Sequence, residues 1–166
     1  HEADSVQIAL AGRMHTLDVR RFAYFLDGGS AKGSGRVERT EQAWPDSLTA
    51  TAVVRWLADA GSWNGDLKLD RMPVDHLGAM SKQAVGWHGR IDGSLELGGS
   101  PPAPRFEAKA EATDFGWRDY RADRVEASAR YGDGVLEVPA TRITMLDVVS
   151  TITGRMPVKL ALGRLP

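Results

Sequence analysis

The feature that most constrains this chain is an alternation of apolar and polar residues with a period of two. Val6, Ile8 and Leu10 alternate with Gln7 and Ala9, and the segment Phe106–Ala112 alternates Phe or Ala with Glu or Lys. Successive side chains of a strand point to opposite faces, so this pattern is typical of strands with one buried face. The sequence therefore predicts an all-β fold.

Further strands and turns follow from the same pattern. We expect strands at Thr49 to Leu57, Asp66 to Leu69, Ser94 to Leu97, Arg124 to Tyr131, Val135 to Val138, Ala31 to Val37 and Val148 to Thr153, whereas Leu17 to Leu26 fits a strand or a helix. Turn residues separate them at Asp27-Gly28-Gly29, Asp92-Gly93, Gly98 to Pro102 and Gly132-Asp133-Gly134. Short strands joined by glycine turns predict a curled, antiparallel, meandering sheet.

One segment has a helical pattern. Asp70 precedes Pro73, and Val74, Leu77 and Met80 fall at helical spacing, which predicts a short helix over residues 72–80. Its apolar side is too small to form a core, so we expect it to lie against the sheet. There it would act as a structural plug or as a gate over a groove.

A short repeat occurs three times. The segments Gly65–Leu69, Gly93–Leu97 and Gly134–Val138 share the pattern glycine, any residue, apolar, charged, apolar. Each would start a strand directly from a glycine. The spacing is irregular, which favours a meandering sheet over a β-helix with a fixed period.

Composition excludes several classes of protein. Of the 166 residues, 42% are hydrophobic and 26% charged, which suits a folded domain that needs no disulfide or metal. The formal net charge of -1 offers no basis for binding nucleic acid. No apolar run approaches the roughly 18 residues of a membrane span, and the start at His1 lacks a signal pattern. Any anchor is expected outside this sequence.

No motif for catalysis or metal binding stands out. His76 and His88 have Asp75 nearby, but their spacing matches no metal motif. There is no cysteine and no Gly-x-Ser-x-Gly elbow. Gly33-Ser34-Gly35 begins like a dinucleotide fingerprint, but the third glycine is missing. We therefore expect a protein that is not an enzyme, with no catalytic residue, metal or cofactor; an unrecognised hydrolase site is the minor alternative.

The expected apolar face is unusual because many of its residues are small. Alanine recurs where sandwich cores prefer Val, Ile or Phe. Either these residues pack closely against the helix or a second sheet, or they leave an apolar trough for a hydrocarbon chain. The candidate groove residues are Val6, Ile8, Leu10, Leu67, Leu69, Leu95, Leu97, Phe106, Ala108, Ala110, Ala112, Val125, Ala127, Ala129, Leu136 and Val138.

The middle of the chain resembles a known family. The run Gly89 to Ser100, followed by Pro104 and Phe106, resembles the repeat of the TamB and AsmA-like family, in which a glycine-rich turn and a proline lead into the next strand. Upstream, Leu67 to Leu77 is similar to the strand and short helix that precede that repeat. The resemblance covers about residues 61–140. It departs from the family pattern at Ser100, where threonine is commoner, and residues 141–166 do not align.

The resemblance implies a β-taco, a long curled sheet that is apolar inside. The whole chain, residues 1–166, would be one segment of a longer array in the periplasm, tethered to the inner membrane by a segment outside this sequence. The groove would hold phospholipid acyl chains for transport between the two membranes, and the full protein would work with an outer-membrane barrel partner of the TamA type. The alternative is a scaffold whose edge strands pair with client strands during outer-membrane protein assembly. Self-association through cut sheet edges is also expected.

Overall fold

The computed structural model describes residues 5–13, 15–39, 61–75 and 86–159. Within these residues the chain forms nine strands, and only Val74 and Asp75 are in helical conformation. The strands are β1 (Ser5–Arg13), β2 (Thr16–Leu26), β3 (Gly29–Glu38), β4 (Ser62–Pro73), β5 (Trp87–Ser100), β6 (Ala103–Trp117), β7 (Tyr120–Gly132), β8 (Val135–Met145) and β9 (Val148–Pro157).

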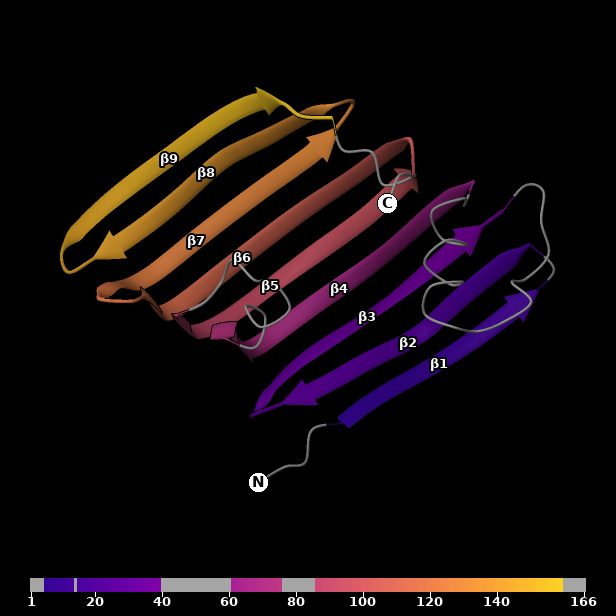
Figure 1. Ribbon diagram of the computed structural model, residues 1–166, viewed down its shortest axis with the longest axis horizontal. Helices are drawn as coiled ribbons and strands as arrows, with labels where there is room; N and C mark the ends of the chain where they lie inside the picture. Colours follow the sequence, from indigo (N-terminus) through magenta and orange to yellow (C-terminus); the bar gives the residue numbers. More distant parts are fainter. Residues whose placement is uncertain (1–4, 14, 40–60, 76–85, 160–166) are drawn as a thin grey trace.

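All nine strands belong to one antiparallel sheet in which each strand pairs with its neighbours in sequence. Figure 1 shows them side by side in chain order, from β1 in indigo to β9 in yellow at the opposite margin. The sheet therefore does not close on itself. The predicted all-β antiparallel meander is confirmed, and Leu17 to Leu26 is a strand. The strand expected at Thr49 to Leu57 lies outside the described residues.

The strands are longer than the alternation alone indicates. The central strands β5 and β6 contain 14 and 15 residues, so β6 extends roughly 50 Å at about 3.3 Å per residue. With about 4.8 Å between neighbouring strands, the nine strands cover roughly 38 Å from β1 to β9. The result is one large face on each side of the sheet.

The helix expected over residues 72–80 does not begin at Met72. Met72 and Pro73 instead end β4, with Met72 opposite Ile91 and Pro73 opposite Arg90 of β5. Val74 and Asp75 are in helical conformation, and residues 76–80 lie outside the described residues. A β-bulge between Leu69 and Met72 interrupts the pairing of β4 with β5 just before this point.

The turn expected at Asp92-Gly93 is wrong, because both residues lie inside β5. Asp92 lies instead opposite the bulge of β4. Between Leu69 and Met72, two residues of β4 face one residue of β5. Arg71 takes a left-handed conformation with a φ of 47°. The backbone N–H of Arg71 donates to Asp92 Oδ1 at 3.0 Å. The Asp92 carboxylate therefore provides the acceptor for a backbone N–H at the bulge of the neighbouring strand.

The repeat predicted from the glycines has a structural counterpart that differs from the expectation. Gly65 and Gly93 lie inside β4 and β5 and do not start these strands. The segments Gly65–Leu69 and Gly93–Leu97 pair with each other residue for residue, so Gly65 faces Leu97 and Leu69 faces Gly93. Only the third copy starts a strand, since β8 begins directly after Gly134.

Similar irregularities interrupt other strands. Two residues of β2, Arg20 and Arg21, lie opposite one residue in both neighbouring strands. In β8, an extra residue lies between Val138 and Thr141 in the pairing with both β7 and β9. Pro139 occurs at this point, as expected for a residue without a backbone N–H. Bulges raise the local twist and bend a strand, so they curve the sheet.

Candidate functional site: the apolar face of the sheet

The pairing register brings all sixteen candidate groove residues onto one face of the sheet. One row crosses every strand and consists of Val6, Tyr24, Ala31, Leu69, Gly93, Ala110, Ala127, Thr141 and Ile152. A second complete row consists of Leu10, Val19, Gly35, Gly65, Leu97, Phe106, Tyr131, Leu136 and Met156. Residues that face each other across antiparallel strands share a side of the sheet. We call this side the apolar face.

The remaining candidates belong to the same face. Ile8, Leu67, Leu95, Ala108 and Ala129 form a partial row between the two complete ones. Ala112 faces Val125, and Val138 follows Leu136 at the alternating position. The register thus places the candidate groove residues together on the apolar face. Their contact with a ligand stays a prediction.

Side-chain size varies across the apolar face. In β6 and β7, Ala108 faces Ala129 and Ala110 faces Ala127, which gives a patch of small side chains in the middle of the sheet. Beside it, Phe106 stacks on Tyr131 with ring centroids 5.5 Å apart. The small side chains form a depression in the apolar face, and the larger side chains beside them form its sides.

The apolar face is least covered at the two margins of the sheet. In β1, Val6, Ile8 and Leu10 are 58–60% exposed. In β9, Val148 and Ile152 are 65% and 55% exposed. Within the described residues the extensive contacts of each strand are with its neighbours in the sheet, and no second layer packs on this face. Large exposed apolar surfaces in folded proteins mark sites of interaction.

Sequence reasoning missed a substantial part of this face. The row residues Val19 and Tyr24, together with Phe22, come from β2, which the sequence left open between strand and helix. Their spacing explains the ambiguity, because the bulge at Arg20 and Arg21 places Phe22 three residues after Val19. The signal that could have identified these residues is that two alternating segments meet between Val19 and Phe22, where the apolar positions shift by one residue.

Over β4 to β7 the opposite face is built mainly from charged and hydroxyl side chains. Its rows include Lys68, Ser94, Lys109 and Ser128 in one case, and Asp92, Glu111, Glu126 and Arg142 in another. The guanidinium of Arg124 links two of the carboxylates, at 2.9 Å from Glu111 and 3.0 Å from Glu126. It thereby offsets the repulsion between like charges that face each other directly.

One carboxylate of this polar face has a shifted pKa. Lys109 lies 3.1 Å from Glu107, and its ammonium hydrogen bond lowers the pKa of the Glu107 carboxyl, with a further contribution from the charge of Arg130. Arg130 Nε lies 3.5 Å from the other Glu107 oxygen. These exposed pairs form a solvated network of the kind that normally covers a water-facing sheet.

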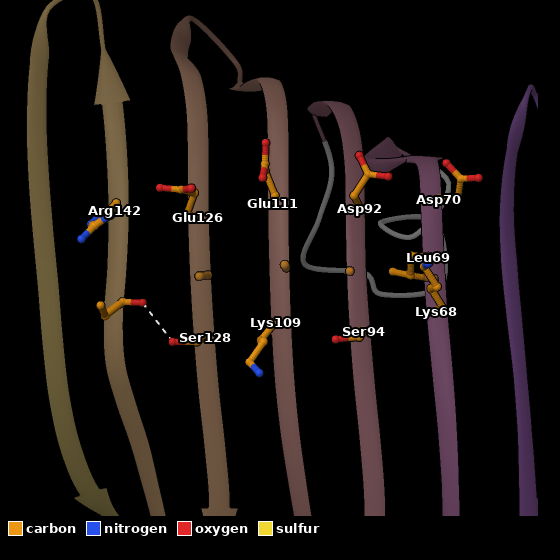
Figure 2. Close-up of a pocket in the computed structure, with 14 residues that line it drawn as sticks. Lys68, Leu69, Asp70, Asp92, Ser94, Lys109, Glu111, Glu126, Ser128 and Arg142 are labelled. Atoms are coloured by element: carbon orange, nitrogen blue, oxygen red, sulfur yellow. Dashed lines mark hydrogen bonds between the residues drawn. The ribbon is translucent and has the colours of Figure 1, made fainter.

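A shallow hollow of about 750 Å³ lies over β4 to β8 on the polar face. Figure 2 shows its polar side chains in two rows, with Asp92, Glu111 and Glu126 above Ser94 and Lys109. The Ser128 hydroxyl donates to the Ala140 carbonyl at 3.2 Å at one end. Seven of its fourteen lining residues are charged, and charged groups favour water over hydrocarbon, so this hollow is not the apolar trough expected from the sequence.

A metal site would need several His, Asp or Glu side chains close together in the described ranges. No group of three or more His, Asp or Glu side chains there is arranged to hold a metal ion. His88 lies in β5 opposite Gly116, Asp75 follows β4, and His76 is outside the described residues. In the same ranges no helix is long and apolar enough to cross a membrane.

Comparison of the chain with protein-family models, with curated proteins and with solved structures found no match in any of the three.

Proposed function

We propose that this chain is a segment of a periplasmic bridge protein that holds phospholipid acyl chains on its apolar face. The observation that carries the proposal is a face that is apolar over nine strands and uncovered by a second layer in the described residues. Burial of hydrocarbon is worth about 0.8 kcal/mol per CH₂ and has no directional requirement. An acyl chain therefore gains free energy on such a surface while it remains able to slide.

The dimensions and the small-residue patch support an extended apolar ligand over a compact one. Complete rows run across all nine strands, so the surface is continuous between β1 and β9. The patch made by Ala108, Ala110, Ala127 and Ala129 offers room at its centre. By the resemblance of residues 61–140, the segment would lie in the periplasm, tethered to the inner membrane and working with an outer-membrane partner of the TamA type. That location is part of the proposal.

Photo-crosslinking tests the proposal. A photoreactive side chain at Ala110 lies on the apolar face, and the same side chain at Lys109 lies one residue away on the polar face. In the presence of phospholipid vesicles we expect lipid adducts from position 110 and few from position 109. Equal crosslinking from both positions would show that the alternation does not define the lipid site. Mass spectrometry of lipid extracted from the purified protein is the second readout.

A second candidate function has its own supporting observation. The strands β1 and β9 lie at the margins of the open sheet and each pairs with one neighbour among the described strands. Such edges can take up an extended client segment by β-augmentation, as a scaffold for outer-membrane protein assembly would. Binding of unfolded barrel peptides that is indifferent to substitution of Ala110 would favour this function over lipid binding.

A further inference from the structure

The margin at β9 has the most exposed strand of the sheet. Every residue from Val148 to Pro157 is exposed, and Leu146 in the preceding turn is 87% exposed. One side of β9 pairs with β8, and no strand of the described residues pairs with its other side. An edge whose outer backbone groups have no partner among the described strands can pair with another strand.

Over residues 148–154, β9 lacks the charges and the proline by which edge strands normally avoid pairing. Residues 148–154, Val-Val-Ser-Thr-Ile-Thr-Gly, contain five β-branched residues and no charge. Lysine, proline or a bulge in the middle of the strand would block a partner. The charged residue that follows, Arg155, is engaged with Glu137 of β8 at 3.1 Å. An uncharged segment of high β-propensity at an exposed edge is suited to pairing with another strand.

The other margin is less suited to this role. The strand β1 is uncharged from Ser5 to Gly12, but it alternates its apolar residues with Gln7, Ala9 and Ala11, and alanine has low β-propensity. The difference in β-branched content singles out β9.

We propose that β9 pairs antiparallel with β9 of a second copy, across a two-fold axis perpendicular to the sheet at Ile152. In this register Ile152 faces its own counterpart, and Val148 faces Met156 of the partner copy. On the polar face Thr151 faces Thr153 of the partner copy, and Arg155 faces Val149. These pairs join apolar to apolar, hydroxyl to hydroxyl or a charge to an uncharged residue, and Ser150 faces Gly154, so no like charges oppose each other.

Symmetry favours a second copy as the partner. A two-fold axis perpendicular to the sheet keeps both apolar faces on the same side and makes the new ladder antiparallel, like the rest of the sheet. Pairing of β9 with β1 of another copy, with the faces preserved, would instead be parallel, because β1 and β9 run in the same direction in the meander. Parallel pairs are slightly weaker, and such a contact would repeat without closing.

Pairing of β9 with a second copy does not depend on lipid binding. The second copy occupies the β9 edge, whereas the ligand proposed above occupies the face. The dimer would join two apolar faces into one continuous surface. Failure of the dimer in lipid-free solution leaves the lipid test at Ala110 and Lys109 untouched, and the reverse also holds.

Disulfide crosslinking tests the register, because the chain contains no cysteine. In the 166-residue protein, Ile152→Cys places two thiols directly opposite each other, within the Cα separation that a disulfide spans. Ser150→Cys lies on the same apolar face, but its counterpart is displaced by four residues, roughly 13 Å along the strand. We expect oxidation to give a covalent dimer with Ile152→Cys and not with Ser150→Cys. Equal yields from both variants would overturn the register.

Charge substitution tests the contact without a crosslink. The double variant Thr151→Glu with Thr153→Glu places two pairs of carboxylates opposite each other, and we expect the dimer dissociation constant to rise at least about tenfold. The variant Thr151→Glu with Thr153→Lys places opposite charges there and should restore dimerisation. In both, residue 151 lies beside Arg142 of β8, so the fold itself keeps a favourable contact.

Sedimentation equilibrium of lipid-free protein over a concentration series measures these constants. The paired substitutions Gln7→Glu with Ala9→Glu in β1 serve as the control and should leave dimerisation unchanged. A wild-type protein that is monomeric at high micromolar concentration would overturn the proposal. So would dimers that weaken only with the β1 variant. Uptake of an unfolded barrel peptide by β9 in preference to a second copy would assign the edge to the scaffold function.

Discussion

Two adjacent residues in the middle of β6 illustrate how position decides chemistry in this sheet. Ala110 faces Gly93 and Ala127, whereas Lys109 faces Ser94 and Ser128. The two side chains differ by one position in sequence and point to opposite faces, since the side-chain period of a strand is two. Neighbouring substitutions can therefore address the apolar and polar faces separately.

Arginine at position 110 should abolish lipid binding. A guanidinium among acyl chains costs several kcal/mol unless it reaches water or a partner, so we expect Ala110→Arg to lose most phospholipid bound per protein in vesicle co-flotation. Lys109→Arg keeps the existing charge on the other face and should bind lipid as the wild type does. Circular dichroism confirms that both variants fold. Normal lipid loading of folded Ala110→Arg would contradict the proposed groove.

The pKa of Glu107 offers a test of the polar network that does not involve a ligand. Because the Lys109 hydrogen bond is the main cause of the lowered pKa, Lys109→Met should raise the pKa of the Glu107 carboxyl toward its ordinary range, with Arg130 retaining part of the effect. NMR titration of the carboxyl carbon measures this. A carboxyl whose folded pKa lies below its unfolded pKa stabilises the fold at pH values above the unfolded one.

That contribution is lost as the pH falls through the folded pKa. The stability of Lys109→Met should consequently be less sensitive to mildly acidic pH than that of the wild type. Arg155→Met, which removes the partner of Glu137 on another strand, is the matched control and should leave the Glu107 titration unchanged. A shift of Glu107 in the control variant would assign its pKa to the overall charge of the face.

At the scale of strands, the alternation was sufficient to predict which residues share a face, and the bulges mark where it stopped being sufficient. Val6 to Leu10 and Phe106 to Ala112 run without an extra residue on that strand, and both were assigned from the sequence. In β2 and β4, a bulge changes the phase and produces a spacing of three, between Val19 and Phe22 and between Leu69 and Met72. A spacing of three also fits a helix.

The β2–β3 hairpin depends on backbone conformation more than on contacts. Asp27 and Gly28 form its two-residue turn with φ values of 45° and 72°, as a type I′ turn requires. A Cβ at Gly28 would meet no atom within 4 Å, and the same holds for Gly154, which lacks a positive φ. The two glycines therefore differ in conformation and not in available space.

Gly28→Ala should accordingly destabilise the protein by about 1 kcal/mol, because an L-residue pays for the left-handed conformation. Gly154→Ala should be neutral or slightly stabilising, since alanine has less freedom to lose on folding. Urea denaturation of both variants measures the difference. Equal losses of stability would show that the hairpin turn does not hold the described conformation.

The bulge of β4 gives a further prediction for this level of structure. Asp92→Ala removes the acceptor of the Arg71 N–H and should lower the free energy of unfolding by about 1 kcal/mol. Asp92→Asn retains a side-chain oxygen and should lose clearly less. Thermal denaturation distinguishes them at roughly 2–4 °C per kcal/mol for a chain of this size. If Asp92→Asn lowers the free energy of unfolding as much as Asp92→Ala does, then the charge of Asp92, and not its hydrogen bond, supports the bulge.

At the scale of the whole molecule, the described strands form a single sheet with one apolar face and one polar face. Only ten hydrophobic residues of the described part are buried, among them Ala23, Leu26, Ala31 and Met72 near the β2–β3 turn. Elsewhere the apolar face is partly exposed, and the sequence could not indicate this, because alternation shows that one side is apolar without showing what covers it. The sixteen candidate residues could be placed together from sequence, while the nature of their partner depends on experiment.

An apolar face that no second layer covers in the described residues would make the stability of the fold dependent on the proposed lipid. A ligand that binds only the folded state adds about 2.7 kcal/mol at a free concentration of one hundred times its dissociation constant. For a chain of this size that corresponds to a rise in melting temperature of roughly 5–10 °C. We expect delipidated protein to melt lower by this amount than protein reloaded with phospholipid, and its calorimetric transition should regain its position on reloading.

Two comparisons make this last measurement specific. Ala110→Arg should show no increase on reloading, because the charge occupies the patch of small side chains, whereas Lys109→Arg should respond fully. Glycerophosphocholine, which has the headgroup without acyl chains, should have no effect at the same concentration, since burial of hydrocarbon supplies the binding free energy. A rise in melting temperature with glycerophosphocholine alone would indicate that lipid binds on the polar face, where charged side chains line the hollow over β4 to β8.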